Sequence, residues 1–405
     1  MRCGAPPAPS PDVRRRLESP GAPPIDLRIN LQPAHRGQAP RYVAAATSAL
    51  RQTDQWLGPW PHPLLTIVDP SWRGPSAAAD ADAVVLDRTP WWSSTTAMTP
   101  ELAVARALAR RRWSEALPGD DLPTWFVAGL AEFTARRAVS PLFEADNLSP
   151  GYAFLELRFF GGFVPRFARV RLLAQTDGEP VTAYRANPGV SAAAAAPDDV
   201  RALAAKTVLA LGTLERWLGR PTFDQVIGQF AKDSRVERPS IATFAQIASD
   251  VSAQELSWFF DEVFGSSSTF DYGVEQLTSE PEQVGQFVTT VTLRRHGAAR
   301  FTGSSAPPIG PFEAGRGVSL LVQFADGQLR TESWDGRAVQ RVFRYHSPAR
   351  AASAMVDPER TLLLDVDRTN NSMTLAPMTR IASSNWALRW MAWLEHALLT
   401  YAALV

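Results

Sequence analysis

Two neighbouring segments have the residue spacing of helices but carry few side chains that could do chemistry. The first, VARALARRRW at 104–113, contains four arginines and no metal ligand. The second, PTWFVAGLAEFTARR at 123–137, contains a single acid, Glu132, which we expect on a helix face. Charge runs of this kind usually form a solvated face, with the lining of a cleft that attracts anions as the alternative. The arginines concerned are Arg106, Arg110, Arg111 and Arg112.

The residue types that bind metals do not cluster elsewhere in the sequence. Cys3 is the only cysteine, which excludes an internal disulfide and a thiolate metal site. The histidines are scattered and none lies in either segment, so we expect surface or satisfied polar residues at His35, His62, His296, His346 and His396. The sequence therefore predicts no metal and no other cofactor.

Composition describes an ordinary globular chain. The 405 residues are 45% hydrophobic and 20% charged, and the formal net charge is zero. No basic stripe interleaved with aromatic residues occurs, so we expect no nucleic-acid partner. Residues 1–24 read as a disordered, Pro-rich leader without the apolar core of a signal peptide. These features predict a protein that is cytoplasmic or peripheral on a membrane.

Hydrophobic periodicity predicts an α+β fold. A strand at 25–31, a helix at 42–58 and a buried strand at 63–69 are followed by helices from Thr99 to Leu117 and from Pro123 to Ala138. Further helices are expected at 198–219, 222–233 and 252–265, the last with Ser252 and Glu255 as a capping box.

The period changes to two from Val284, which predicts an all-β module. Its expected strands are FVTTVTLRR, VSLLVQFADGQLRTESW, VQRVFRYH and TLLLDVD. The predicted organisation is a leader at 1–24, a domain at 25–280, a β-sandwich-like domain at 281–375 and a terminal helix at 380–405.

Together, the two opening segments resemble the alanyl aminopeptidase family of gluzincin metallopeptidases. The family pattern is H-E-x-x-H, eighteen residues, then the Glu of W-L-N-E-G-F-A. Two His and that Glu hold zinc, and the Glu beside the first His activates the bound water. WFVAGLAEF matches this pattern with Ala128 at the third-ligand position. Counting back places Ala109 and Ala105 at the His positions and Arg106 at the general base.

The resemblance extends over roughly Ile25 to Ser372. The helix LAAKTVLALGTLERWLG matches the family's Y-E-K-G helix, with Ala204 at the tyrosine position and Lys206 retained. The family's G-A-M-E-N segment corresponds to AAADA, where Asp80 is the one acid. On this resemblance, we expect the chain to lack the family's large N-terminal β-domain. The resemblance implies a thermolysin-like domain, a β-sandwich-like module and no zinc.

Loss of the ligands, the base and the tyrosine favours a catalytically inactive, peptidase-like protein retained for binding or scaffolding. We consider a membrane-associated complex as its setting. A different hydrolase could use Asp80, Glu132, Asp120 or Asp121 in the same cleft, with Arg106 as a further cleft residue. An active zinc peptidase requires that the register be wrong.

The last twenty residues, WALRWMAWLEHALLTYAALV, are mostly apolar and have helical spacing. Arg389, Glu395 and His396 argue against a membrane span, because charges are costly in hydrocarbon. The helix either packs on the protein's own body or contacts a membrane surface or an unknown partner protein. The contact residues would be Trp386, Trp390, Trp393 and Tyr401.

Overall fold

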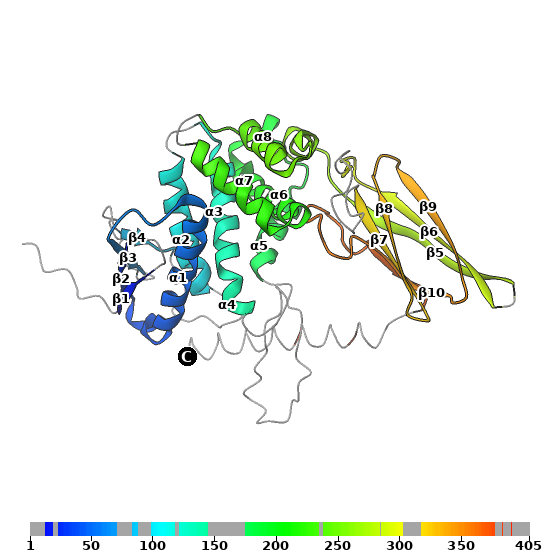
Figure 1. Ribbon diagram of the computed structural model, residues 1–405, viewed down its shortest axis with the longest axis horizontal. Helices are drawn as coiled ribbons and strands as arrows, with labels where there is room; N and C mark the ends of the chain where they lie inside the picture. The colour runs from blue at the N-terminus through cyan, green and yellow to red at the C-terminus, as the bar shows by residue number, and fades with distance from the viewer. Residues whose placement is uncertain are drawn as a thin grey trace, which may run out of the picture. The chain divides into compact units, whose positions relative to one another are not determined.

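The computed structural model describes residues 13–18, 23–70, 83–87, 99–117, 121–144, 175–234, 238–283, 285–302 and 317–376, with residues 383 and 390 (Figure 1). The chain divides into two compact units. Unit 1 comprises Met1–Pro118, Leu130–Glu179 and Ser384–Val405, and unit 2 comprises Gly119–Gly129 and Pro180–Ser383. The domain boundaries expected from the sequence remain a prediction.

Unit 1 contains a mixed sheet in the order β1-β2-β3-β4. Its strands are β1 (Val13–Leu17), β2 (Ile25–Asn30), β3 (Leu64–Val68) and β4 (Ala83–Val85). The pairs β2–β3 and β3–β4 are parallel. Helix α1 provides the crossover that parallel pairing of β2 and β3 requires. The pair β1–β2 is antiparallel. The expectation of a structureless leader is therefore wrong for residues 13–17, whose backbone pairs with β2.

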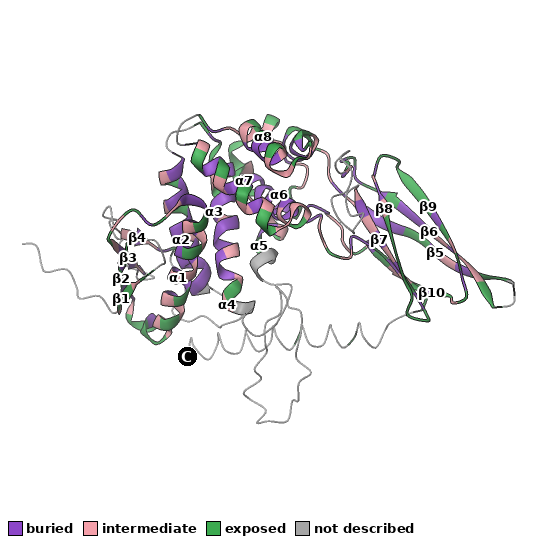
Figure 2. Cartoon of the chain, in the orientation of Figure 1, coloured by how far each residue is buried: buried purple, intermediate pink, exposed green. Residues whose placement is uncertain are grey.

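The helices of unit 1 begin and end close to the expected residues. They are α1 (Ala39–Leu57), α2 (Thr99–Ala116), the part of α3 (Thr124–Val139) from Leu130, and α4 (Pro141–Glu144), after the short η1 (Pro33–Gln38). Helix α1 ends at Gly58, whose φ of 76° suits glycine. Buried residues run along most of α2 and α3 (Figure 2). Because both helices are buried on several sides, their side chains report on core packing.

Unit 2 begins with helices packed around aromatic residues. They are the part of α5 (Gln175–Ala186) from Pro180, α6 (Val200–Leu218), α7 (Arg220–Asp233), α8 (Ile241–Ser252), α9 (Ser257–Phe260) and the π-helical segment η6 (Asp261–Gly265), with two short turns, η4 (Ala192–Ala194) and η5 (Pro197–Asp199). The Phe244 ring contacts those of Phe126, Phe230 and Phe260 edge-on at 5.0–5.8 Å. These contacts join α3, α7, α8 and α9 in one core.

The capping box expected at Ser252 and Glu255 is wrong. Ser252 is the last residue of α8, and its hydroxyl donates to the carbonyl of Ala248. Ala253 ends the helix with a φ of 53°, in the left-handed region. Glu255 instead accepts a hydrogen bond of 2.8 Å from the backbone N–H of Ser257, at the start of α9. The helix expected at 252–265 therefore starts only at Ser257, after the turn that follows α8.

Two antiparallel sheets form the β-module of unit 2. One has the order β11-β10-β7-β8 and the other β5-β6-β9. Strands β10 and β11 contact β5, so the sheets face each other. The strands are β5 (Tyr272–Gln283), β6 (Gln286–Arg295), β7 (Val318–Phe324), β8 (Leu329–Trp334), β9 (Gln340–Ser347), β10 (Ala351–Val356) and β11 (Ser372–Thr374). The module begins twelve residues before the expected Val284, because β5 lacks a clear alternation of polar and apolar residues.

The strand expected at TLLLDVD is also wrong, since only Asp365 forms an isolated bridge, with Phe270. The backbone N–H of Leu362 donates to the carboxylate of Asp357 (2.9 Å), and that of Leu363 donates to the Thr213 hydroxyl (3.0 Å). Side chains thus satisfy the buried backbone that a strand would otherwise pair. The three consecutive leucines of the TLLLDVD segment are buried because the segment packs on α6.

Gly129 allows close contact between α3 and α6. A Cβ at this position would lie 2.4 Å from Thr207 Cβ and 3.0 Å from the Ala204 carbonyl oxygen. We expect Gly129→Ala to lower the free energy of unfolding by about 1–3 kcal/mol through overpacking. Gly228→Ala is the matched control, because a Cβ there meets no atom within 4 Å. The control should stabilise its helix by about 0.5–1 kcal/mol. Urea unfolding of both variants checks this, and equal effects would contradict it.

Candidate functional site

Helix α2 presents one side to α1. Glu101 accepts two hydrogen bonds from Arg41 of α1, at 2.6 and 2.8 Å, and its side chain is 7% exposed. One turn from the other end of α2, Arg112 donates to the carbonyls of Leu57 and Gly58, where α1 ends. A guanidinium at this position satisfies carbonyls that a helix end leaves without partners. The α1 side of α2 is therefore fixed by charge at both ends.

A second side of α2 faces α3. Arg106 donates two hydrogen bonds to Glu132, from Nε at 2.6 Å and from a terminal nitrogen at 2.8 Å. Two turns further along, Trp113 is fully buried and its Nε1 donates to the Thr134 hydroxyl at 2.9 Å. The bidentate ion pair is the stronger link, because both groups are charged and the geometry matches.

Each residue of an α-helix is rotated by about 100° from the one before it. This rotation places Ala105 and Ala109 on the part of the α2 surface that lies between the side facing α1 and the side facing α3. Ala105 is 0% exposed and Ala109 is 1% exposed, so their methyl groups are covered by protein. These are the two positions that the resemblance assigns to histidine ligands. Alanine has no donor atom, and the residues at these positions do not fit a zinc ion.

Four charged side chains of unit 1 form a network at the α3 side of α2. Glu132 also accepts from Arg136, at 2.6 Å. Glu179, on α5, accepts from Arg106 at 2.6 Å and from Arg136 at 3.4 Å. Arg136 is 8% exposed and Glu179 is 56% exposed. The network therefore runs from a buried arginine to a carboxylate in solvent.

The network keeps Arg106 and Glu132 charged. Burial alone would lower the pKa of Arg106, but the hydrogen bonds and charge of Glu132 and Glu179 raise it above its ordinary value. Burial alone would raise the pKa of Glu132, but Arg106 and Arg136 lower it below its ordinary value. Burial lowers the pKa of Arg136, with partial compensation by Glu132. A cation without an acceptor atom thus occupies the position that the resemblance assigns to the general base.

The other three arginines of the first segment belong to different environments. Arg110 pairs with Asp87 at 2.9 Å, and both side chains are about half exposed. Arg111 pairs with Glu115 one turn along α2 at 2.6 Å. The expectation of a solvated face is wrong for Arg112, which is 5% exposed and lies over the Trp60 ring. Hydrogen bonds to the carbonyls at the end of α1 compensate for the burial of the Arg112 charge.

Ala128 and Ala204, the remaining positions from the resemblance, belong to unit 2. Ala128 is exposed on α3, and Ala204 is half-buried on α6 beside Gly129. Their assembly with Ala105 and Ala109 into one site remains a prediction. Lys206, two residues after Ala204 on α6, is 1% exposed. It donates a 2.8 Å hydrogen bond to the Val190 carbonyl. Burial lowers its pKa to about 8.

A buried His–Asp pair in unit 1 was not expected from the sequence. His35 Nδ1 lies 2.7 Å from Asp69 Oδ2 and 3.1 Å from the Tyr42 hydroxyl, and both members of the pair are at most 2% exposed. The pair joins η1 to the end of β3. The sequence signal was an acid directly after a buried strand, with a histidine five residues after the end of the neighbouring strand. His35 fits the expectation of a satisfied polar residue.

Several candidate residues lie outside the described residues: Asp80, Asp120, Trp386, Trp393 and Tyr401. Trp390 is helical and 51% exposed. No group of three or more potential metal ligands occurs within the described part of the chain. Among the helices described, none has the length and hydropathy needed to cross a membrane.

No protein-family model matches the sequence, and no curated protein matches it significantly. Solved structures do match. One is the crystal structure of Legionella pneumophila aminopeptidase A in complex with aspartic acid, with a TM-score of 0.51 and 13% sequence identity. The match covers 85% of this chain and 36% of that chain, so this chain spans little more than a third of its length. The chain has a mixed α+β, peptidase-like fold.

Proposed function

We propose that this chain is a catalytically inactive protein with a peptidase-like fold, retained for binding or scaffolding. The observation that carries the proposal is the complete burial of Ala105 and Ala109 at the two histidine positions of the resemblance. A catalytic zinc requires three protein ligands and an open coordination position. Alanines covered by protein supply neither a donor atom nor access for water.

Arg106 supports the same proposal. General-base catalysis contributes about 10²–10⁴-fold and needs a group that accepts a proton near neutral pH. A guanidinium with a raised pKa, paired with Glu132, cannot accept one. The Arg106–Glu132 pair joins α2 to α3, a role for which the family uses the metal and its ligands.

Hydrolysis of aminoacyl and peptide reporter substrates by the purified full chain tests this proposal. We expect no turnover above the buffer rate, with or without added zinc. Activity that follows the protein through successive columns and disappears with a chelator would contradict it. A homologous active aminopeptidase, assayed in parallel, shows that the substrates and conditions are adequate.

Attachment through the segment that includes Trp386, Trp390, Trp393 and Tyr401 is the second part of the proposal. The exposure of Trp390, at 51%, supports it, because amphipathic aromatic side chains favour membrane interfaces and partner surfaces. A chain that ends at Met378 should fold like the full chain and should lose sedimentation with vesicles or partners. Unfolding of the truncated chain would indicate instead that the segment packs on the protein.

A further inference from the structure

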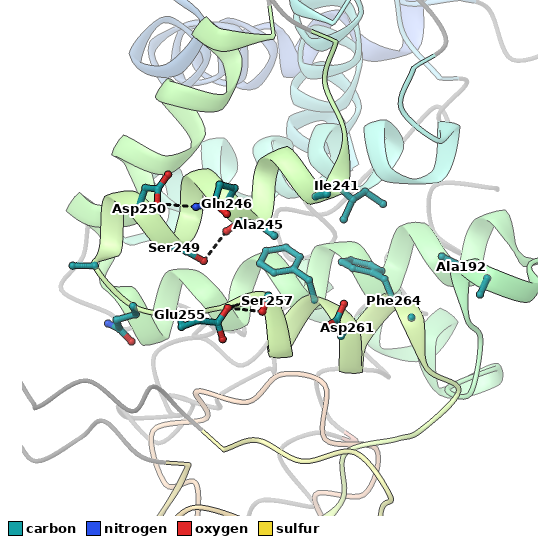
Figure 3. A pocket seen from close by; sticks show the side chains of 16 residues that line it. Ala192, Ile241, Ala245, Gln246, Ser249, Asp250, Glu255, Ser257, Asp261 and Phe264 are labelled. Carbon is teal, nitrogen blue, oxygen red and sulfur yellow. Dashed lines mark hydrogen bonds between the residues drawn. The ribbon is translucent and has the colours of Figure 1, made fainter.

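An open groove of about 870 Å³ lies within unit 2, between α8 and the α9–η6 segment. Its apolar lining includes Ile241, Ala245, Phe260 and Phe264. Figure 3 shows Phe264 between the two helical segments, with Asp250 and Glu255 towards one end and Ala192 towards the other. The π-helical η6 lines the groove, and such segments are frequent at functional sites.

Every charged residue that lines the groove is acidic. Asp250, Glu255 and Asp261 are exposed, and neither lysine nor arginine lines it. Asp250 accepts a hydrogen bond from Gln246, whereas the described residues provide no hydrogen bond or ion pair to the side chain of Asp261. Asp261 therefore has its full capacity to accept hydrogen bonds from a ligand.

The sequence that contains most of the groove residues is also free of basic residues. Between Arg238 and Arg294 the chain contains eight carboxylates and no lysine or arginine, although the whole protein has 41 residues of each sign. The members of this set are Asp250, Glu255, Asp261, Glu262, Asp271, Glu275, Glu280 and Glu282. Glu275 pairs with Arg294 and Glu282 lies against His346 on the β-module. The carboxylates that act at the groove are therefore those that line it, Asp250, Glu255 and Asp261, which attract cations and repel anions. The groove thus combines an apolar floor with an acidic border.

We propose that this groove binds a cationic amphipathic helix of a partner protein. Apolar residues on one face of such a helix would cover the more exposed apolar residues Ala193, Ile241 and Ala242. Its lysines or arginines would pair with Asp250 and Asp261. Helix α8 has twelve residues, or about 18 Å, enough for a ligand of about three turns. The inference depends on the groove and its charge, and holds whether or not α2 and α3 once held a metal.

A helical ligand suits the groove better than an extended one. The groove is lined by helices, η4 and the turn at 253–255, with no strand among the described residues that line it. An extended peptide would find no strand edge to satisfy its backbone N–H and C=O groups. A helix satisfies its own backbone and needs only side-chain contacts.

Fluorescence anisotropy with the full chain tests the proposal. The probe is a fluorescein-labelled peptide of Leu, Lys and Ala, with leucines three and four residues apart so that they share one helix face. One control peptide has the same composition in shuffled order, and another has Glu in place of Lys. We expect saturable binding of the first peptide, weakened by salt, and at least roughly tenfold weaker binding of both controls.

Two matched variants locate the site. Asp250→Asn with Asp261→Asn should weaken binding of the first peptide about tenfold, by removing two border charges. Glu280→Gln with Glu332→Gln removes two exposed charges from β5 and β8, outside the groove, and should leave binding unchanged. Circular dichroism and melting curves confirm that both variants fold. Absence of binding, equal losses in the two variants, or equal binding of the shuffled peptide would each overturn the proposal.

Discussion

Replacing Glu132 with alanine is expected to lower the free energy of unfolding by about 3 kcal/mol. Glu132 accepts hydrogen bonds from both Arg106 and Arg136, and its side chain is 23% exposed. Its removal leaves the 8%-exposed Arg136 with Glu179 as a carboxylate partner at 3.4 Å. A buried guanidinium that has lost its main counter-charge is costly, whereas water compensates an exposed one.

Asp87→Asn provides the control for this prediction. It breaks the Arg110–Asp87 pair, whose side chains are 49% and 57% exposed. Exposed pairs contribute about 0–1 kcal/mol, so this variant should unfold almost like the wild type. Urea titration monitored by circular dichroism measures both variants. If Glu132→Ala lowered the free energy of unfolding no more than Asp87→Asn does, the charged network would not be what holds α2 against α3.

Lys206→Met is expected to stabilise the protein by about 2 kcal/mol below pH 8. A folded pKa of about 8, against 10.5 for an ordinary lysine, corresponds to a penalty of roughly 3 kcal/mol for the buried charge. Loss of the hydrogen bond to the Val190 carbonyl offsets about 1 kcal/mol of the gain. Methionine fills a similar volume without a charge.

The stabilisation of the protein by Lys206→Met should disappear as the pH rises. A lysine whose folded pKa is lowered is fully penalised below the folded value and not at all above the unfolded value. The wild type should therefore gain stability from about pH 8 to pH 10.5, and Lys206→Met should not share this gain. Unfolding free energies at pH 7, 9 and 10 test it. Parallel pH profiles for the two proteins would contradict a lowered pKa for the buried Lys206.

Local sequence patterns predicted most of the helical framework. Spacing and caps placed α1, α2, α3, α6 and α7 within a few residues of their observed ends. The same rules missed β5 and β10, whose residues do not alternate clearly, and read a strand at 361–367. The latter failed because Asp357 and Thr213 satisfy its backbone from distant positions. Periodicity carries no information about such side-chain partners.

The candidate site was predictable in position but not in its contacts. Spacing and resemblance singled out Ala105, Arg106 and Ala109 on α2, and Glu132 was expected on a helix face. The pairing of Arg106 with Glu132, 26 residues away, depends on how α2 packs against α3. Sequence spacing also could not show that Arg112 would be buried under the carbonyls of α1. Tertiary packing decides which of several neighbouring arginines meets a carboxylate.

The metal content of the purified full chain tests the central claim most directly. The claim is that the positions corresponding to the zinc ligands, Ala105, Ala109 and Ala128, hold no donor atoms. After incubation with excess zinc and removal of free metal by gel filtration, elemental analysis should find far less than one zinc per chain. One tightly held zinc per chain, released by a chelator with loss of thermal stability, would contradict the claim.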